Sequence, residues 1–272
     1  MKTKTPVPTN LMNTTPSGGE VDIGLYRITV YPTIGGGAFG HVCKAVHKDT
    51  LERVAAKGIR YSWDDENDDM CNVALAEAEN MKRIRHENIV PLIDYESHEG
   101  TVWIFMELCE EGDLDRYMRR NAEMTFARKC NIMVQIASAV NYLHSLNPPI
   151  IHRDIKPQNV LMKFAENGAE IALLSDFGFA KLFDRSFTLT GSKFYFAANI
   201  SQKGTPHYMA PEFFLLESSS EIYTTAVDIF GLGLLYVGLL EVKPGCSSTL
   251  PLSGKKLYWL LIYNGYLYIL YS

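Results

Sequence analysis

Three short strings in the second half of the chain limit what it can fold into more than any other feature. Residues 152–159 read HRDIKPQN, residues 176–178 read DFG, and residues 204–212 read GTPHYMAPE. The first string places an aspartate and an asparagine five residues apart, with a lysine between them. Their order and spacing together are difficult to obtain by chance, so they indicate a chemical site rather than three ordinary turns.

A glycine-rich segment precedes these strings in the first half of the chain. Residues 34–42 read IGGGAFGHV, in which Gly35, Gly37 and Gly40 give the spacing G-x-G-x-x-G. Glycines let the backbone approach phosphate oxygens closely and adopt positive φ angles. The spacing alone does not decide the fold, because dinucleotide-binding folds share it and an ordinary glycine hairpin would also contain it.

The residues that follow this segment separate the alternatives. No Lys-Ser or Lys-Thr pair follows, so the Walker-type loop is absent. A Rossmann loop should open a helix, whereas residues 42–46 read VCKAV, which predicts a strand. Lys57 then lies in the middle of another predicted strand, where its ammonium group can be held over two phosphates.

A partner for this lysine is expected on the next helix, predicted over residues 73–85. Glu77 and Glu79 are the two candidates. They lie about 200° apart around an α-helix, so only one of them can face Lys57. We expect Glu77 to be the partner, with Glu79 as the alternative.

The remaining pattern divides the chain into a strand-rich first half and a helical second half. Short β-branched and apolar runs predict strands at 26–34, 42–47, 53–59, 89–94 and 102–108. Apolar residues at spacings of three and four predict helices over 126–145 and 224–241. A ligand is expected between the two halves.

Taken together, these motifs resemble those of the eukaryotic protein kinase family, from about Tyr26 to about Leu240. The resemblance implies an α+β fold with two lobes in a domain over residues 25–241. The small β-rich N-lobe, with one main helix, would cover about 25–107. The larger, mainly helical C-lobe would begin at about residue 112.

The resemblance also implies a role for each chemical residue. Asp154 would accept the proton of the substrate hydroxyl, and Lys156 would neutralise the transferring phosphoryl group. Asn159 and Asp176 would supply oxygen ligands to Mg²⁺, with Mn²⁺ as an alternative metal. Lys57 would hold the phosphates of ATP that are not transferred.

The nucleotide site follows from the same resemblance. Met106 would be the gatekeeper, residues 107–109 the hinge, and Asp113 the carboxylate that reaches the ribose. Cys109 is expected to be a buried, inert thiol, with a modifiable thiol as the alternative. The complete set expected around ATP is Ile34, Gly35, Gly36, Gly37, Ala38, Phe39, Gly40, His41, Val42, Ala55, Lys57, Met106, Glu107, Cys109, Asp113 and Leu161.

The motifs also indicate the substrate and its control. Lys156 and Thr205 match the serine/threonine-specific class, so the expected partner is a protein that presents serine or threonine. Dual specificity is an alternative. The segment 176–212 is long for a loop, and Arg153 can pair with a loop phosphate. We therefore expect activation-loop phosphorylation by an upstream kinase, with Thr190 as the first candidate and an unmodified insert as the alternative.

The family pattern stops after about Glu241. Residues 242–272 are apolar and do not resemble the further helices of the family, so they are interpreted as a divergent tail on an apparently truncated domain. An alternative function is therefore a catalytically impaired nucleotide-binding or scaffold protein. A small-molecule phosphotransferase is disfavoured, because such enzymes lack the platform that residues 204–212 would provide.

Composition limits the other functions. The 272 residues carry a net charge of −5, which gives no basic field for nucleic acid. Residues 1–24 are rich in Thr, Pro, Ser and Gly, which predicts a flexible leader without a signal or transit peptide. No run reaches the ~18–20 apolar residues of a membrane span. The five scattered cysteines suit a reducing compartment. The expected location is the cytoplasm, with the nucleus as an alternative.

Overall fold

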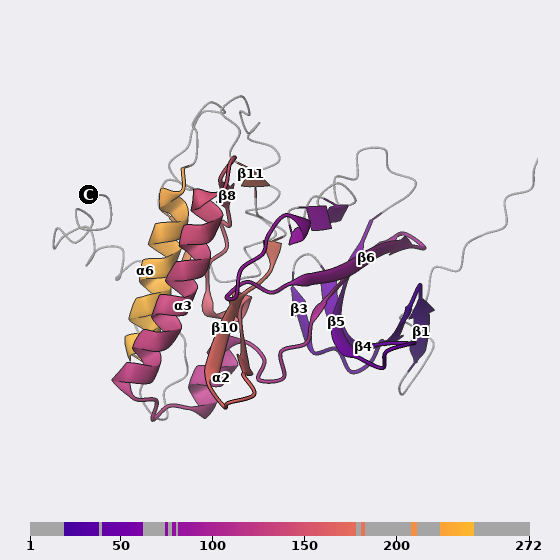
Figure 1. The fold of residues 1–272 in the computed structure, drawn as a ribbon, viewed down its shortest axis with the longest axis horizontal. Coiled ribbons are helices and arrows are strands. Elements are labelled where there is room, and N and C mark those ends of the chain that lie inside the picture. Colours follow the sequence, from indigo (N-terminus) through magenta and orange to yellow (C-terminus); the bar gives the residue numbers. More distant parts are fainter. Residues whose placement is uncertain are drawn as a thin grey trace, which may run out of the picture.

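The computed structural model places a β-sheet at one side of the molecule and the long helices at the other (Figure 1). It describes residues 19–37, 40–61, 74–75, 78–79, 81–177, 181–182, 208–210 and 224–241. The expected tail at 242–272 lies outside these residues. In the described part of the chain, no helix is long and apolar enough to cross a membrane.

The sheet is antiparallel throughout and has seven strands. They are β1 (Glu20–Ile23), β2 (Tyr26–Thr29), β3 (Gly35–Gly37), β4 (Gly40–His47), β5 (Arg53–Arg60), β6 (Leu92–His98) and β7 (Thr101–Glu107). Their order is β1-β2-β4-β5-β7-β6, and β3 pairs with β4. The three glycines of β3 therefore run back along β4, which makes the glycine-rich segment a hairpin and not the start of a helix.

An apolar core packs against each face of this sheet. Alternate residues of β5 and β7 point to opposite faces, so each strand contributes side chains to both cores. Ala55 and Met106 belong to the main apolar core, which continues into the helical lobe. Ala56 and Phe105 belong to a second core, in which the Tyr26 ring stacks on Phe105 at 3.8 Å between ring centroids. Residues 54–59 are all buried for this reason.

The first strand corrects the expected leader. Residues 20–23 form β1, which pairs with β2, although residues 1–24 were expected to be flexible. Ile23 is buried in the second core, and Arg27 Nε lies 3.0 Å from Asp22 Oδ1 across the hairpin. A four-residue strand is held by these contacts and not by its composition, so the composition of the segment gave no sign of it.

Two other strand boundaries also differ from expectation. β2 ends at Thr29, well before residue 34. β6 begins at Leu92 and runs to His98, whereas a strand was expected at 89–94. Ile89 makes only an isolated bridge to Leu174, so its apolar side chain packs between lobes instead of starting the edge strand.

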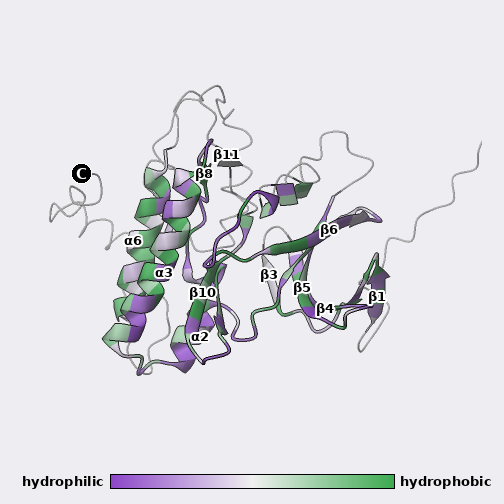
Figure 2. Ribbon diagram, viewed as in Figure 1, coloured by the Kyte–Doolittle hydropathy of each residue, from purple (hydrophilic) through white to green (hydrophobic). Residues whose placement is uncertain are grey.

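The helices lie mainly in the second half, as expected. They are α2 (Leu114–Arg120), α3 (Phe126–Ser145) and α6 (Ala226–Glu241). α3 has the predicted bounds, and the Thr125 side chain caps it by accepting from the Arg128 backbone N–H. α6 packs along α3 and is largely hydrophobic (Figure 2). In the predicted helix over 73–85, the described residues are helical up to Lys82.

Short strands and one turn of helix carry the predicted catalytic strings. They are β8 (Ile150–Ile151), η1 (Pro157–Asn159), β9 (Val160–Phe164), β10 (Glu170–Leu174) and β11 (Lys181–Leu182). β9 pairs with β10 and β8 with β11. Residues 152–159 and 176–177 therefore lie at the ends of paired strands.

Glu170, at the start of β10, ties this hairpin to two helices. Its carboxylate accepts from Arg128 Nε at 3.0 Å and Nη2 at 2.7 Å on α3, and from the Tyr117 hydroxyl at 2.5 Å on α2. The hydrogen bond from Arg128 holds the pKa of Glu170 below its ordinary value. The carboxylate therefore stabilises the fold most in its charged form.

We expect Glu170→Gln to lower the free energy of unfolding by about 1–3 kcal/mol at pH 7, because bonds to a charged acceptor are lost. A carboxyl group whose pKa is lowered by folding contributes its full stabilisation at a pH above its unfolded-state pKa. That stabilisation is lost as the pH falls through the folded-state pKa. The wild-type protein should therefore lose stability more steeply than Glu170→Gln as the pH falls below the pKa of an ordinary carboxyl group. Urea unfolding at several pH values measures both slopes. Glu166→Gln, an exposed change in the same hairpin, is the control, and equal slopes for wild type and Glu170→Gln would contradict the prediction.

Candidate active site

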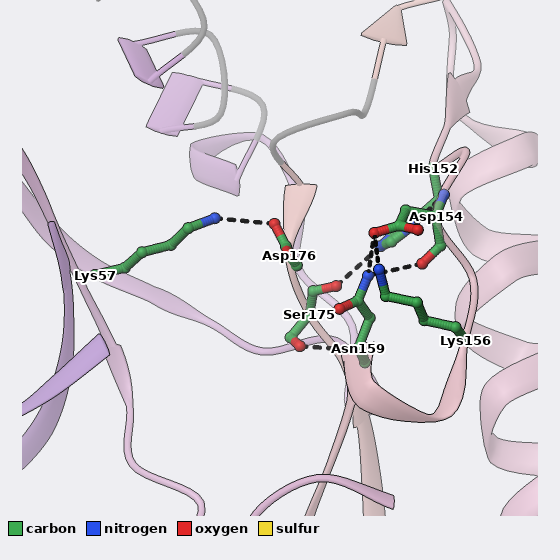
Figure 3. Close-up of polar contacts among 7 residues, drawn as sticks. All are labelled: Lys57, His152, Asp154, Lys156, Asn159, Ser175 and Asp176. Atoms are coloured by element: carbon green, nitrogen blue, oxygen red, sulfur yellow. Dashed lines mark hydrogen bonds and ion pairs between the residues drawn. The ribbon is translucent and has the colours of Figure 1, made fainter. Parts of the chain in front are cut away.

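An ion pair joins the sheet to the second lobe. Lys57 Nζ lies 2.9 Å from Asp176 Oδ1, as Figure 3 shows. Lys57 is 7% exposed in the middle of β5, and Asp176 follows β10 with φ +66°, in the left-handed region. Burial opposes the charge on Asp176, but the nearby Lys57 ammonium outweighs burial and holds the pKa of the carboxyl below its usual value.

The structure answers part of the question about the partner of Lys57. Glu79, the alternative, is exposed, and its carboxylate accepts from Lys82 Nζ at 3.2 Å and from the Tyr95 hydroxyl at 2.8 Å. Its hydrogen bonds therefore go to Lys82 and Tyr95 and not to Lys57, so that alternative is wrong. Glu77 lies outside the described residues, so its pairing stays a prediction.

Asp154 is held by the two residues predicted to act with it. Its Oδ2 accepts from Lys156 Nζ at 2.7 Å and from Asn159 Nδ2 at 2.7 Å. Asn159 Nδ2 also donates to the backbone oxygen of Asp154 at 2.8 Å. Both partners of that nitrogen can only accept, which fixes the orientation of the amide and leaves its Oδ1 as the atom able to bind a metal.

His152 connects two backbone segments of the site. Its Nε2 lies 3.0 Å from the Ser175 carbonyl oxygen, and its Nδ1 accepts from the Asp154 backbone N–H at 3.3 Å. Because a carbonyl only accepts, Nε2 is the donor in this contact, and Nδ1 is the acceptor for the backbone N–H. The Phe177 ring meets His152 edge-on, with ring centroids 5.1 Å apart. This histidine therefore links the Asp154 segment to the Asp176 segment.

Asp228, at the start of α6, fixes the backbone of the same segment. It is 1% exposed and accepts from the N–H groups of His152 at 2.8 Å and Arg153 at 2.7 Å, and from His144 Nε2 at 2.8 Å. Arg153 has φ +66°, a conformation that needs such support. The sequence analysis did not select Asp228 as a site residue. The available signal was a carboxylate in the first turn of a helix that carries no other charged residue before its last position, Glu241.

The residues expected around the adenine come together. Ala55 pairs with Met106 across β5 and β7, and both lie in one apolar cluster. Four other expected residues belong to or pack against the same cluster: Ile34, Val42, Cys109 and Leu161. Burial raises the pKa of the Cys109 thiol to about 12, which favours the expected buried, inert thiol over the modifiable alternative.

The two polar residues expected here have structural partners. Asp113 is the N-cap of α2, where it accepts from the Arg116 backbone N–H at 2.8 Å. Glu107 forms an ion pair with Lys163 Nζ at 2.5 Å. Asp113 also forms an isolated β-bridge with Leu161 of β9, which packs against the apolar cluster, so Asp113 lies beside that cluster. The Glu107 carboxylate is held by β9 and leaves only its backbone for a nucleotide.

The sheet register corrects the expectation for His41. His41 lies opposite Gly58, and Gly58 lies opposite Trp103, whereas Val42 lies opposite Lys57. Neighbouring residues of a strand point to opposite faces. The His41 side chain therefore lies on the face away from Lys57, edge-on to Trp103 at 5.6 Å between centroids. It does not join the side chains expected around the nucleotide.

Gly40 shows why this hairpin needs glycine. Its φ is +138°, and an added Cβ would lie 2.0 Å from the Gly58 backbone oxygen. No other residue fits without moving the neighbouring strand. Several expected residues lie outside the described part of the chain: Ala38, Phe39, Glu77, Thr190 and Thr205.

We expect Asp228→Ala to lower the free energy of unfolding by about 2–5 kcal/mol, because the buried His152 N–H and the partly buried Arg153 N–H lose their acceptor. It should also reduce any activity that depends on Asp154, since the backbone of that segment loses its support. Thermal unfolding measures the first effect. Asp49→Ala, an exposed change, is the control. An unchanged melting temperature for Asp228→Ala would contradict the assignment.

Comparison with known proteins agrees with this geometry. Residues 28–255 match the family described as the protein kinase domain, so the match continues past residue 241, where the sequence analysis ended the domain. A protein named as a probable myosin light chain kinase of Dictyostelium discoideum is 34% identical over 80% of this chain. Serine/threonine-protein kinase ATG1c of Arabidopsis thaliana is 34% identical over 76%, and serine/threonine-protein kinase tousled-like 1 of Mus musculus 31% identical over 77%.

The matches cover different shares of these relatives. The chain spans 51% of the length of the myosin light chain kinase relative, 26% of ATG1c and 27% of tousled-like 1. What is shared is therefore the catalytic domain. The chain belongs to the protein kinase domain family. Two of the relatives named above are serine/threonine-protein kinases by name.

Proposed function

We propose that this chain transfers the γ-phosphoryl group of Mg-ATP to serine or threonine side chains of a protein substrate. The observation that carries the proposal is the arrangement around Asp154. Both described hydrogen bonds to its side chain reach Oδ2. Its Oδ1 is therefore positioned to accept a hydroxyl proton while the rest of the carboxylate is held still.

The neighbouring groups suit the charge of a phosphoryl transfer. Lys156 donates to Asp154 and places its ammonium group beside the attacking hydroxyl, where negative charge would develop. Lys57, on the other lobe, is held by Asp176 with its ammonium group available to phosphate oxygens. When bound, Mg-ATP supplies the transferable group, and these residues position it and neutralise its charge.

The donor set fits a magnesium ion. Asn159 Oδ1 and the Asp176 carboxylate are hard oxygen donors. In the described part of the chain, no group of three His, Cys, Asp or Glu side chains could hold a metal ion by itself. Mg²⁺ commonly takes one or two protein ligands and completes its shell with phosphates and water. A two-ligand site is therefore what a metal carried in with a nucleotide requires.

Regulation by loop phosphorylation is also part of the proposal. Arg153 lies directly before Asp154, where a phosphorylated loop residue could reach it. Thr190 is the first candidate acceptor and an upstream kinase its source. The complete set of chemical residues favours an active transferase over the nucleotide-binding or scaffold alternative.

The test is transfer of radiolabelled γ-phosphate from Mg-ATP to a generic serine/threonine substrate. Asp154→Asn and Lys57→Met should each reduce transfer at least about 100-fold, because each removes a group that acts in the transition state. Lys48→Met and Asp49→Asn, on the exposed turn after β4, serve as matched controls and should stay active. Transfer that survives in both site variants, or none from folded wild type that binds ATP, would overturn the proposal.

A further inference from the structure

Lys163, on β9, binds the first residue of the segment that connects the two lobes. Its Nζ lies 2.5 Å from Oε1 of Glu107, the last residue of β7. β7 belongs to the sheet, where it pairs with β5, whereas β9 pairs with β10 in the second lobe. The ion pair therefore crosses from one lobe to the other beside the predicted hinge at residues 107–109.

Two backbone contacts hold the other end of the same connecting segment on β9. The Met162 N–H donates to the Gly112 carbonyl oxygen at 2.8 Å, and Asp113 forms an isolated β-bridge with Leu161. Lys163 follows Met162 directly on this strand. Three consecutive residues of β9 therefore contact the connecting segment at both of its ends, and the ion pair is the contact at the end nearest the sheet.

The same face of β9 carries Leu161, which is expected to contact the adenine. Successive side chains of a strand point to opposite faces, so Leu161 and Lys163 share one face. Val160 and Met162, which are both buried, share the other. Leu161 packs against the main apolar cluster, which contains Ala55. A displacement of Glu107 from Lys163 would therefore move the hinge backbone relative to the residue on which the base would lie.

Both charges of the pair act on the thiol inside the predicted hinge. Burial is the largest cause of the raised pKa of Cys109, the Glu107 carboxylate raises it further, and the Lys163 ammonium lowers it. The two charged groups therefore lie close to the hinge and partly cancel there. Without Lys163, the carboxylate charge would remain uncompensated beside the predicted site of the base.

We propose that Lys163 is a positioning residue for the base of the nucleotide, because its ion pair with Glu107 holds the hinge backbone beside Leu161. The inference rests on the proposed function, since it concerns the nucleotide site of that transferase. The side chains of Lys163 and Glu107 are 28% and 32% exposed, so solvent weakens their attraction. A pair of this kind changes an equilibrium by a factor of about 2–5.

The test compares ATP with adenosine, which carries the base but no phosphates, by isothermal titration calorimetry. Lys163→Met should weaken the binding of both ligands by the same factor, about 2–5, because the change acts where the base binds. Loss of a positive charge alone would weaken ATP and spare adenosine, which is uncharged. The KM for ATP should rise by the same factor without a change in kcat, since the contacts around Asp154 are kept.

Three further variants separate positioning from other effects. Lys163→Arg keeps a cation that can pair with Glu107 and should bind both ligands as wild type does. Lys82→Met removes an equal charge from a second lysine–glutamate pair, which Lys82 forms with Glu79, and should change neither affinity. Because the two groups act through one contact, Glu107→Gln combined with Lys163→Met should be no worse than either single variant.

Unchanged adenosine affinity in Lys163→Met would overturn the inference, and so would fully additive losses in the double variant or an equal loss in Lys82→Met. A wild-type protein that binds adenosine and ATP but transfers no phosphoryl group would overturn the proposed function instead. The two binding constants would then still decide whether Lys163 positions the base.

Discussion

The ion pair between Lys57 and Asp176 is the interaction on which the rest of the site depends. Lys57 is almost fully buried, and a buried ammonium group is costly unless a carboxylate compensates it. Asp176 provides that compensation from the other lobe, at 2.9 Å. The pair therefore connects the N-terminal sheet to the segment that follows β10. It also holds both charged groups where phosphate and metal would bind.

Each side of this pair is held by a different kind of structure. Lys57 is fixed by its strand, because β5 lies between β4 and β7 and is buried on both faces. Asp176 is held in place by a chain of hydrogen bonds through neighbouring residues. The carboxylate of Asp228 holds the backbone of His152, and His152 in turn donates to the Ser175 carbonyl oxygen next to Asp176. Packing positions the lysine, and buried hydrogen bonds position the carboxylate.

The sequence predicted the catalytic residues better than it predicted the elements that position them. Asp154, Lys156 and Asn159 come together as expected, because residues so close in sequence need only a short turn to meet. The bounds of α3 were also correct, since apolar residues at spacings of three and four mark them. Such features depend on local sequence and can be recognised without a structure.

Features that depend on distant contacts were missed. β1 exists because β2 and the second core hold it, and the direction of His41 is set by register with Gly58 and Trp103. Neither register nor a partner strand can be deduced from composition. The role of Asp228 depends on backbone groups far away in the chain, so its position in α6 gave only a weak signal.

The most direct test of the account is a crystal structure of the protein with Mg²⁺ and a non-hydrolysable ATP analogue. The account predicts a metal ion bound by the Asp176 carboxylate and Asn159 Oδ1, with Lys57 Nζ in contact with phosphate oxygens. It also predicts adenine between Ala55 and Leu161, and Asp154 Oδ1 open to a hydroxyl. A nucleotide bound elsewhere, or a metal held without Asp176 and Asn159, would contradict it.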